Sequence, residues 1–268
     1  MKNLPLLLLL VFISFASCNE KSSKNLDKEM QGFEDLEELT ADFSTWWNYH
    51  YYKISFSSDF IALDENAKVI SKKDFLIKLT SGNYISIESK VKAKADSISY
   101  KLVRLPEGAD KSISTTIKNS AAQAFGYYEM EGKKFPEIDL TAINGQQYKN
   151  ESLIGKITII KTWFIACKPC IAEMPELNEF VHKYRNESDI QFLSLATDSQ
   201  SSLEDFLTKR AFDYVVFPDQ EELIIDQLNL QAYPTHLVLD KNGNIKKIFN
   251  KASELMAYID GHKSLLKI

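Results

Sequence analysis

The sequence predicts an α/β fold for the C-terminal half of the chain, preceded by a small α+β domain. Two observations predict the α/β part. Residues 157–160 form a continuous apolar run, which is typical of a strand buried on both faces of a sheet. Beyond this run, strand and helix patterns alternate, as in a parallel sheet covered by helices. A chain of 268 residues has room for two domains, at about 150 residues each.

Composition and charge exclude several classes of protein. With 44% hydrophobic residues and a formal charge of −5, the chain has an ordinary core and lacks the basic surface that binds nucleic acid. None of the nine glycines lies two positions from another, which excludes a G-x-G-x-x-G dinucleotide loop. The three cysteines, Cys18, Cys167 and Cys170, are too few for a disulfide scaffold or a four-thiolate zinc site.

Residues 1–17 are typical of a bacterial lipoprotein signal peptide. Lys2 supplies the positive charge, and the apolar run at residues 5–13 is shorter than the roughly 20 residues that span a bilayer. Small residues follow, interrupted by Phe15, in an order that resembles a lipobox ending at Cys18. We expect Cys18 to be lipidated and residues 18–29 to be a solvated tether, which places the protein in the cell envelope, facing the periplasm. The alternatives are an ordinary cleaved signal and an uncleaved anchor.

Residues 30–131 are expected to form the small α+β domain, in which we find no catalytic constellation. Apolar spacings of three and four predict one helix between Met30 and Trp47. Alternating patterns predict a strand at residues 54–56 and two antiparallel strands at 91–95 and 97–102, with one wet, basic face. A helix capped by Ser71 and a second helix at residues 111–130 complete the domain. We interpret the aromatic residues of segment 46–56 as core packing, with a recognition surface as the alternative.

Short-range patterns predict the elements of the second domain, residues 132–268. Asn144-Gly145 is a strong hairpin signal. Strands are expected at residues 192–196, 214–217, 237–239 and 245–249, and helices at 177–184, 203–207, 223–228 and 255–265.

A Cys-x-x-Cys pair stands at the junction between the buried strand and the helix that follows it. A helix N-terminus offers free N–H groups and about half a positive charge, so we expect a lowered pKa for Cys167. Cys170 lies one turn deeper and is expected to be shielded, and Pro169 fits the first turn. The spacing brings both sulfurs onto one helix face. A strand–helix alternation around such a junction is the layout of a thioredoxin-like fold.

Cysteine pairs with this spacing also occur as halves of zinc sites. The chain has no second pair, and its histidines at positions 50, 182, 236 and 262 show no ligand spacing. We therefore favour a redox pair that uses no metal and no other cofactor.

Residues 132–268 resemble the TlpA/ResA branch of membrane-anchored thioredoxin-like proteins, in the form found in Bacteroidetes-type bacteria. The matching motifs are Phe135-Pro136-Glu137-Ile138-Asp139-Leu140, Gly155-Lys156, Trp163, Cys167-Lys168-Pro169-Cys170, Glu173-Met174-Pro175 and Tyr233-Pro234-Thr235.

The resemblance implies roles for several of these residues. Pro234 is expected to follow a cis peptide bond and to face the disulfide, with the backbone of Tyr233 free to pair with a substrate strand. Glu173 is expected near the cysteines as a proton acceptor, and Pro175 is expected to kink the active-site helix. Trp163, Pro169 and Thr235 are expected to support the site.

Two positions depart from related proteins. The residue before the first cysteine is often Trp in the branch and is Ala166 here, which leaves open surface beside Cys167. Thioredoxins carry a buried acid six residues before the first cysteine, and here that residue is Lys161. A buried lysine is costly unless it is paired. We therefore predict a Lys161–Glu173 interaction that tunes Cys170, with Lys161 reaching the surface as the alternative.

The resemblance implies a membrane-anchored thiol–disulfide oxidoreductase that reduces disulfides of extracytoplasmic proteins. A DsbD/CcdA-type membrane reductant would restore its dithiol, and cytochrome c maturation is a common role in the branch. One alternative is an envelope binding lipoprotein in which the thioredoxin domain has an accessory or isomerase role. Another is a copper-handling protein, but such proteins typically place three residues between the cysteines and a histidine where this chain has Tyr233.

Overall fold

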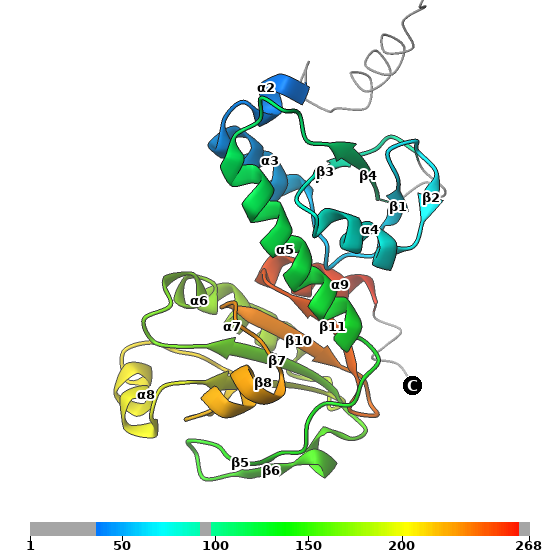
Figure 1. The fold of residues 1–268 in the computed structure, drawn as a ribbon. Helices are drawn as coiled ribbons and strands as arrows, with labels where there is room; N and C mark the ends of the chain where they lie inside the picture. The colour runs from blue at the N-terminus through cyan, green and yellow to red at the C-terminus, as the bar shows by residue number, and fades with distance from the viewer. Residues whose placement is uncertain (1–35, 92–97, 263–268) are drawn as a thin grey trace, which may run out of the picture.

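The computed structural model describes residues 36–91 and 98–262, and the predicted signal peptide, tether and Cys18 lie outside them. The described chain forms an N-terminal and a C-terminal unit, and the long helix α5 (Lys111–Met130) extends from the first to the second (Figure 1). Among the described residues no helix is both long and apolar enough to cross a membrane.

The N-terminal unit is a four-stranded sheet with helices packed against it. Its strands are β1 (Ile61–Leu63), β2 (Val69–Ile70), β3 (Tyr84–Glu88) and β4 (Ser99–Arg104), in the order β2-β1-β4-β3. β1 runs parallel to β4, and the other two pairs are antiparallel. The helices besides α5 are α2 (Leu36–Thr40), α3 (Phe43–Lys53) and α4 (Lys72–Leu79).

The predicted single helix at the start of this unit is wrong, because the chain breaks at Asp42 between α2 and α3. The Asp42 carboxylate accepts hydrogen bonds from the amides of Ser44 and Thr45, at 3.1 and 2.8 Å, and so starts a new helix. The predicted strand at residues 54–56 is also absent. Ile54 instead closes α3, with its amide bonded to the carbonyl of His50 at 3.1 Å.

The predictions for the sheet are partly right. The strand predicted at 97–102 appears as β4, and β3 is its antiparallel neighbour. Most of the predicted strand 91–95 lies outside the described residues. The wet, basic face is wrong for Lys101, which is only 9% exposed because β4 lies between β1 and β3. The helix capped by Ser71 and the helix at residues 111–130 are confirmed as α4 and α5.

The C-terminal unit confirms the α/β fold class. Its five-stranded sheet has the order β11-β10-β7-β8-β9, with β7, β8 and β9 parallel and β10 antiparallel to both neighbours. The strands are β7 (Ile157–Trp163), β8 (Ile190–Ala196), β9 (Val215–Phe217), β10 (Thr235–Leu239) and β11 (Ile245–Phe249). The hairpin predicted around Asn144-Gly145 is confirmed as β5 (Asp139–Thr141) and β6 (Gln147–Lys149), followed by the short helix η1 (Asn150–Leu153).

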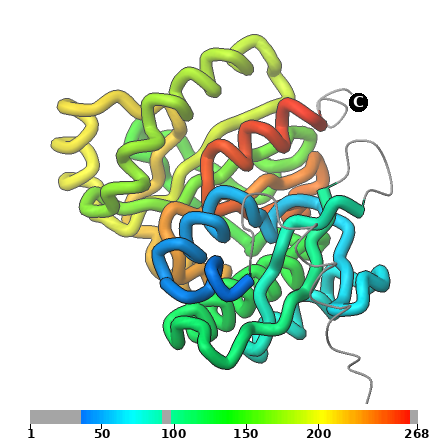
Figure 2. Tube along the Cα trace, turned by 90° about the horizontal axis from the view of Figure 1, so that it is seen from above, coloured from blue at the N-terminus to red at the C-terminus, as the bar shows by residue number. Residues whose placement is uncertain are grey.

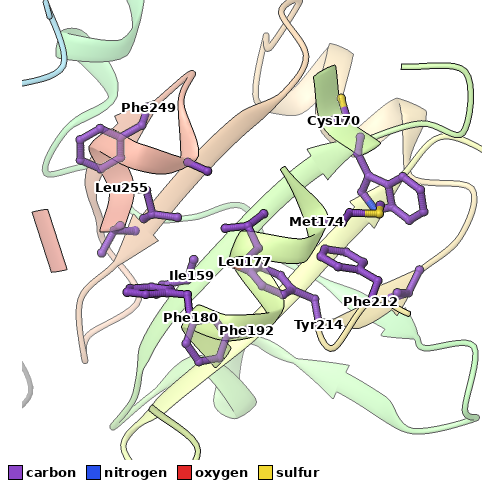
Figure 3. Packing of buried hydrophobic residues seen from close by; sticks show 14 of the residues in the cluster. Ile159, Cys170, Met174, Leu177, Phe180, Phe192, Phe212, Tyr214, Phe249 and Leu255 are labelled. Carbon is purple, nitrogen blue, oxygen red and sulfur yellow. The ribbon is translucent and has the colours of Figure 1, made fainter. Parts of the chain in front are cut away.

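Helices cover both faces of this sheet. Residues of α7 (Met174–Tyr184), α8 (Gln200–Leu207) and α9 (Ala252–Gly261) belong to one core, together with alternate residues of β7 and β8. Figure 3 shows this core, where Leu177 and Phe180 lie over the sheet residues Ile159 and Phe192. The other face packs against the π-helical segment η2 (Leu223–Gln227) and the C-terminal end of α5.

The two units contact each other through polar side chains. Lys247 Nζ on β11 lies 2.6 Å from Asp59 Oδ1, and Lys251 Nζ contacts the carbonyl of Tyr51 on α3. The view from above shows α9 beside the N-terminal unit (Figure 2). At the end of α5, the Tyr127 hydroxyl lies 3.3 Å from Thr235 Oγ1 on β10.

Candidate active site

A disulfide joins Cys167 and Cys170 at the N-terminus of α6 (Lys168–Ala172). Strand β7 ends at Trp163, three residues of loop follow, and Cys167 is the N-cap of α6. The amide of Cys170 donates to Cys167 Sγ at 3.3 Å. Cys167 is 4% exposed and Cys170 is fully buried. The predicted strand-to-helix junction and the shielding of Cys170 are therefore present in the structure.

The loop before Cys167 is held by contacts on both sides. The amide of Ile165 donates to Asp198 Oδ2 at 2.7 Å, which ties the loop to the segment after β8. The ring of Trp163 is fully buried and packs on Phe206 and Phe212, with centroid distances of 5.6 and 5.7 Å. These contacts fix the Trp163 side chain at the end of β7, directly before the loop. Ala166 is exposed beside Cys167.

The Tyr233-Pro234 peptide bond is cis, as expected from the resemblance. The Tyr233 ring meets the Phe164 ring edge to face at 5.2 Å, which connects this turn to the loop before the disulfide. Asn250 Nδ2 donates to the carbonyl of Pro234 at 3.0 Å, and Thr235 Oγ1 donates to the carbonyl of Ala232 at 2.6 Å. The first bond ties the start of β10 to the residue after β11, and the second lies within the turn itself.

Lys161 lies in the middle of β7 with a fully buried side chain, and its Nζ contacts Glu173 Oε1. The predicted contact is therefore present, and the alternative in which Lys161 reaches the surface is excluded. Glu173 lies at the point where the helix is interrupted. Glu173 is both the C-cap of α6 and the N-cap of α7, and Pro175 begins the next turn.

His236 also belongs to this cluster, although no sequence motif indicated it. It is fully buried on β10, and its Nε2 lies 3.0 Å from the same Glu173 Oε1 that Lys161 contacts. The antiparallel register of β10 and β7 pairs His236 with Lys161, so both side chains leave the sheet on one face. The available signal was a histidine in the apolar strand that directly follows Pro234. Metal-ligand spacing was the wrong test for it.

Each charge of this cluster is affected by burial and by its neighbours. Burial alone would raise the pKa of Glu173, but contacts with His236 and Lys161 outweigh it and hold the pKa below its usual value. Burial lowers the pKa of Lys161, and Glu173 opposes that shift. Burial also lowers the pKa of His236, again opposed by Glu173. Contact with Glu173 therefore favours the charged forms of Lys161 and His236, and burial opposes them.

Two more titratable groups belong to this buried region. Tyr214 has a buried hydroxyl without a hydrogen-bond partner among the described residues, and burial and the charge of Glu173 raise its pKa. Burial, and then the charge of Glu173, also raise the pKa of Glu176 on α7. Figure 3 shows Tyr214 near Phe212 and Met174, with Cys170 at the far end of the same cluster.

The arrangement suits thiol–disulfide exchange. Cys167 lies at the start of a helix, where N–H groups and the helix dipole stabilise a thiolate, and the fully buried Cys170 lies one turn further along. Across residues 36–91 and 98–262, no group of three or more His, Cys, Asp and Glu side chains is placed to hold a metal ion.

Comparisons with known proteins agree with this geometry. Residues 132–248 match the model of the AhpC/TSA family. The thiol-disulfide oxidoreductase ResA of Geobacillus kaustophilus (strain HTA426) is 27% identical over 118 residues, which cover 44% of this chain and 67% of the relative. The ResA protein of Bacillus thuringiensis (strain Al Hakam) is 29% identical over 115 residues, covering 42% of this chain and 66% of the relative.

The chain thus spans about two thirds of the length of these curated relatives. Among solved structures, a thiol-disulfide oxidoreductase from Bacteroides fragilis NCTC 9343 is 18% identical and covers 48% of this chain and 98% of its own, with a TM-score of 0.44.

Proposed function

We propose that the protein is a thiol–disulfide oxidoreductase that reduces disulfides of other proteins, because residues 132–248 match the model of the AhpC/TSA family and curated relatives are named thiol-disulfide oxidoreductases. The observation that carries the proposal is the disulfide between Cys167 and Cys170 at the N-terminus of α6. The helix start makes Cys167 the attacking thiolate, and burial reserves Cys170 for the second step.

The reaction proceeds in two exchanges. The Cys167 thiolate attacks one sulfur of a substrate disulfide, a mixed disulfide forms, and the other substrate sulfur leaves as a thiolate. Cys170 then loses its proton and attacks Cys167 Sγ. The Cys167–Cys170 bond forms, the bond to the substrate breaks, and the two electrons of the protein dithiol have reduced the substrate.

The finer parts of the proposal concern place and partners. The signal-like residues 1–17 and the lipobox-like context of Cys18 support a lipid-anchored protein of the cell envelope that faces the periplasm. Its substrates would then be extracytoplasmic proteins with disulfides, and a DsbD/CcdA-type membrane reductant would restore the dithiol. A Cys18→Ser variant should leave the membrane fraction and appear in the soluble fraction.

A redox titration with a disulfide-reduction assay tests the activity. Reduced protein should reduce insulin disulfides, and Cys167→Ser should abolish this reaction. A potential near −270 mV would support a reductant, and one near −120 mV would support an oxidant. Lack of exchange with any disulfide by the wild-type dithiol would overturn the proposal.

A further inference from the structure

A groove of about 810 Å³ is lined by one face of α5 and by the segment that leads from η2 towards β10. On the helix face, the small residues Ala122 and Gly126 are exposed and lie one turn apart. The segment contributes residues 227–231, and the apolar side chains of Met130 and Leu228 also line the groove. Its volume falls within the range of ligand sites, which is about 300–1,000 Å³.

The groove ends beside the turn that contains the cis peptide bond. Gln231 lines the groove and lies two positions before Tyr233 in the chain. The Tyr233 ring contacts Phe164 at a centroid distance of 5.2 Å, and the Phe164 carbonyl accepts from the Cys167 amide at 3.1 Å. Tyr127, which also lines the groove, has its hydroxyl 3.3 Å from the first residue of β10. A polypeptide joined to Cys167 can therefore pass this turn and continue into the groove.

Carboxamide side chains form much of the polar lining of the groove. They are Asn119, Gln123, Gln227, Asn229 and Gln231. None of the five makes a side-chain hydrogen bond within the described part of the chain. By contrast, Asn150, Gln191 and Asn250 each donate to a main-chain carbonyl at 3.0 Å. A carboxamide offers two N–H donors and one carbonyl acceptor, which are the groups that pair with a peptide main chain.

The charged residues of the lining are largely engaged with other parts of the protein. Glu129 forms an ion pair with Lys73 at 3.0 Å, and Lys134 Nζ donates to the carbonyl of Asn242 at 2.6 Å. The exposed Lys133 adds one positive charge. The groove is therefore better suited to an uncharged segment than to a strongly ionic one.

We propose that this groove binds an extended segment of the substrate protein, a few residues away from the substrate cysteine that reacts with Cys167. The main-chain N–H and C=O groups of the segment pair with the carboxamides, and its apolar side chains pack towards Met130 and Leu228. Small-molecule sites are lined mainly by apolar side chains with few polar groups, so five carboxamides favour a polypeptide. The inference rests on the proposed oxidoreductase function, and it gives α5, which extends between the two units, a part in substrate binding (Figure 1).

The test compares two peptide probes on full-length reduced protein. Each probe has a single cysteine in a disulfide with 5-thio-2-nitrobenzoate, whose coloured thiolate leaves when Cys167 attacks the peptide sulfur. One probe has two uncharged residues on each side of its cysteine, and the other has eight. These flanks span about 7 Å and about 26 Å when extended. We expect the longer probe to react about tenfold faster, which corresponds to about 1.4 kcal/mol or to one or two hydrogen bonds.

Gly126→Met places a long side chain in the groove. A Cβ at Gly126 meets no heavy atom of the surrounding structure within 4 Å, and methionine favours a helix more than glycine does. In this variant the ratio of the two rate constants should fall from about tenfold to about one. The matched control is Gly261→Met, because Gly261 is an exposed glycine of α9 with equal space around it that does not line the groove. Its ratio should equal that of the wild type.

A second measurement, on wild-type protein, covers the case that Gly126→Met does not fold. N-methylation of alternate amides in the longer flanks removes main-chain N–H groups, and the longer probe should then lose most of its advantage. Equal rates for the two unmethylated probes, an unchanged ratio in folded Gly126→Met, or an advantage that survives methylation would overturn the proposal. Failure of the wild type to release the coloured thiolate from either probe would instead overturn the oxidoreductase function, so the two failures are distinguishable.

Discussion

Lys161 and Glu173 form a buried ion pair in the protein interior behind the disulfide. The pair joins the central strand β7 to the point where α6 ends and α7 begins. Because both groups are removed from water, each depends on the other for charge compensation. The pair is therefore relevant both to the stability of the domain and to the protonation of the groups around Cys170.

Removal of the lysine should destabilise the protein. Lys161→Met leaves the Glu173 carboxylate buried with only His236 beside it, and we expect a loss of about 3–5 kcal/mol in the free energy of unfolding. Lys161→Met combined with Glu173→Leu should lose less than Lys161→Met alone, because no charge remains to be buried. Urea unfolding at pH 7 measures both. Lys156→Met, an exposed lysine just before β7, is the control and should change stability by under about 0.5 kcal/mol.

Replacement of the buried cysteine should trap the intermediate. Cys170→Ser keeps the attacking thiolate of Cys167 but removes the group that resolves the mixed disulfide. We expect a stable covalent complex with a disulfide substrate, visible as a mass increase on a non-reducing gel. Cys167→Ser should form little or none. Equal trapping by the two variants would assign the wrong order to the two sulfurs.

Stability should fall between about pH 6.5 and pH 4 because of His50. Burial lowers the pKa of His50 from 6.5 to about 4. Over this interval the unfolded chain binds a proton and the folded chain does not, so stability is complete above pH 6.5 and decreases as the pH falls. The shift corresponds to about 3 kcal/mol.

A matched pair of variants isolates this contribution. His50→Phe keeps the ring that stacks on Trp46 at 4.9 Å and should flatten the decrease measured by urea unfolding at several pH values. His182→Gln changes an exposed histidine on α7 and should leave the decrease as it is. A His50→Phe profile that matches the wild type would show that other groups control this pH range.

The contact between the two units should depend on Lys247. Its buried Nζ lies 2.6 Å from Asp59 Oδ1 and 3.4 Å from Glu131 Oε1 at the end of α5. Asp59 is largely exposed, so its ion pair with Lys247 contributes little to stability. Burial raises the pKa of Glu131, and the charge of Lys247 opposes this shift, so the Glu131 carboxylate depends on Lys247 for charge compensation.

We therefore expect Lys247→Met to lower the free energy of unfolding by about 2 kcal/mol. Lys246→Met changes the neighbouring, exposed position of β11 and should have an effect of under about 0.5 kcal/mol. Urea unfolding measures both variants. Equal losses in the free energy of unfolding for Lys247→Met and Lys246→Met would show that Lys247 does not stabilise the buried Glu131 carboxylate.

Features set by neighbours in the sequence were predictable. The Cys-x-x-Cys junction, the Asn144-Gly145 hairpin and the helix capped by Ser71 follow from periodicity and from residues at most a few positions apart. The break at Asp42 is also local, but the apolar spacing across it favoured one helix. The same periodicity rule therefore succeeded for α4 and failed for α2 and α3.

Other features depended on distant parts of the chain. Lys101 is buried because β1 pairs with β4, which no local pattern indicated. The sequence by itself identified Cys167 and Cys170 as the redox pair. For Lys161 it left two possibilities, a side chain that reaches the surface and one that is buried and paired. Only the tertiary structure decided that choice and added His236, because the register of β10 on β7 places its imidazole beside Glu173. Sheet register acts between residues far apart in the chain, and the chemistry around the buried cysteine depends on it.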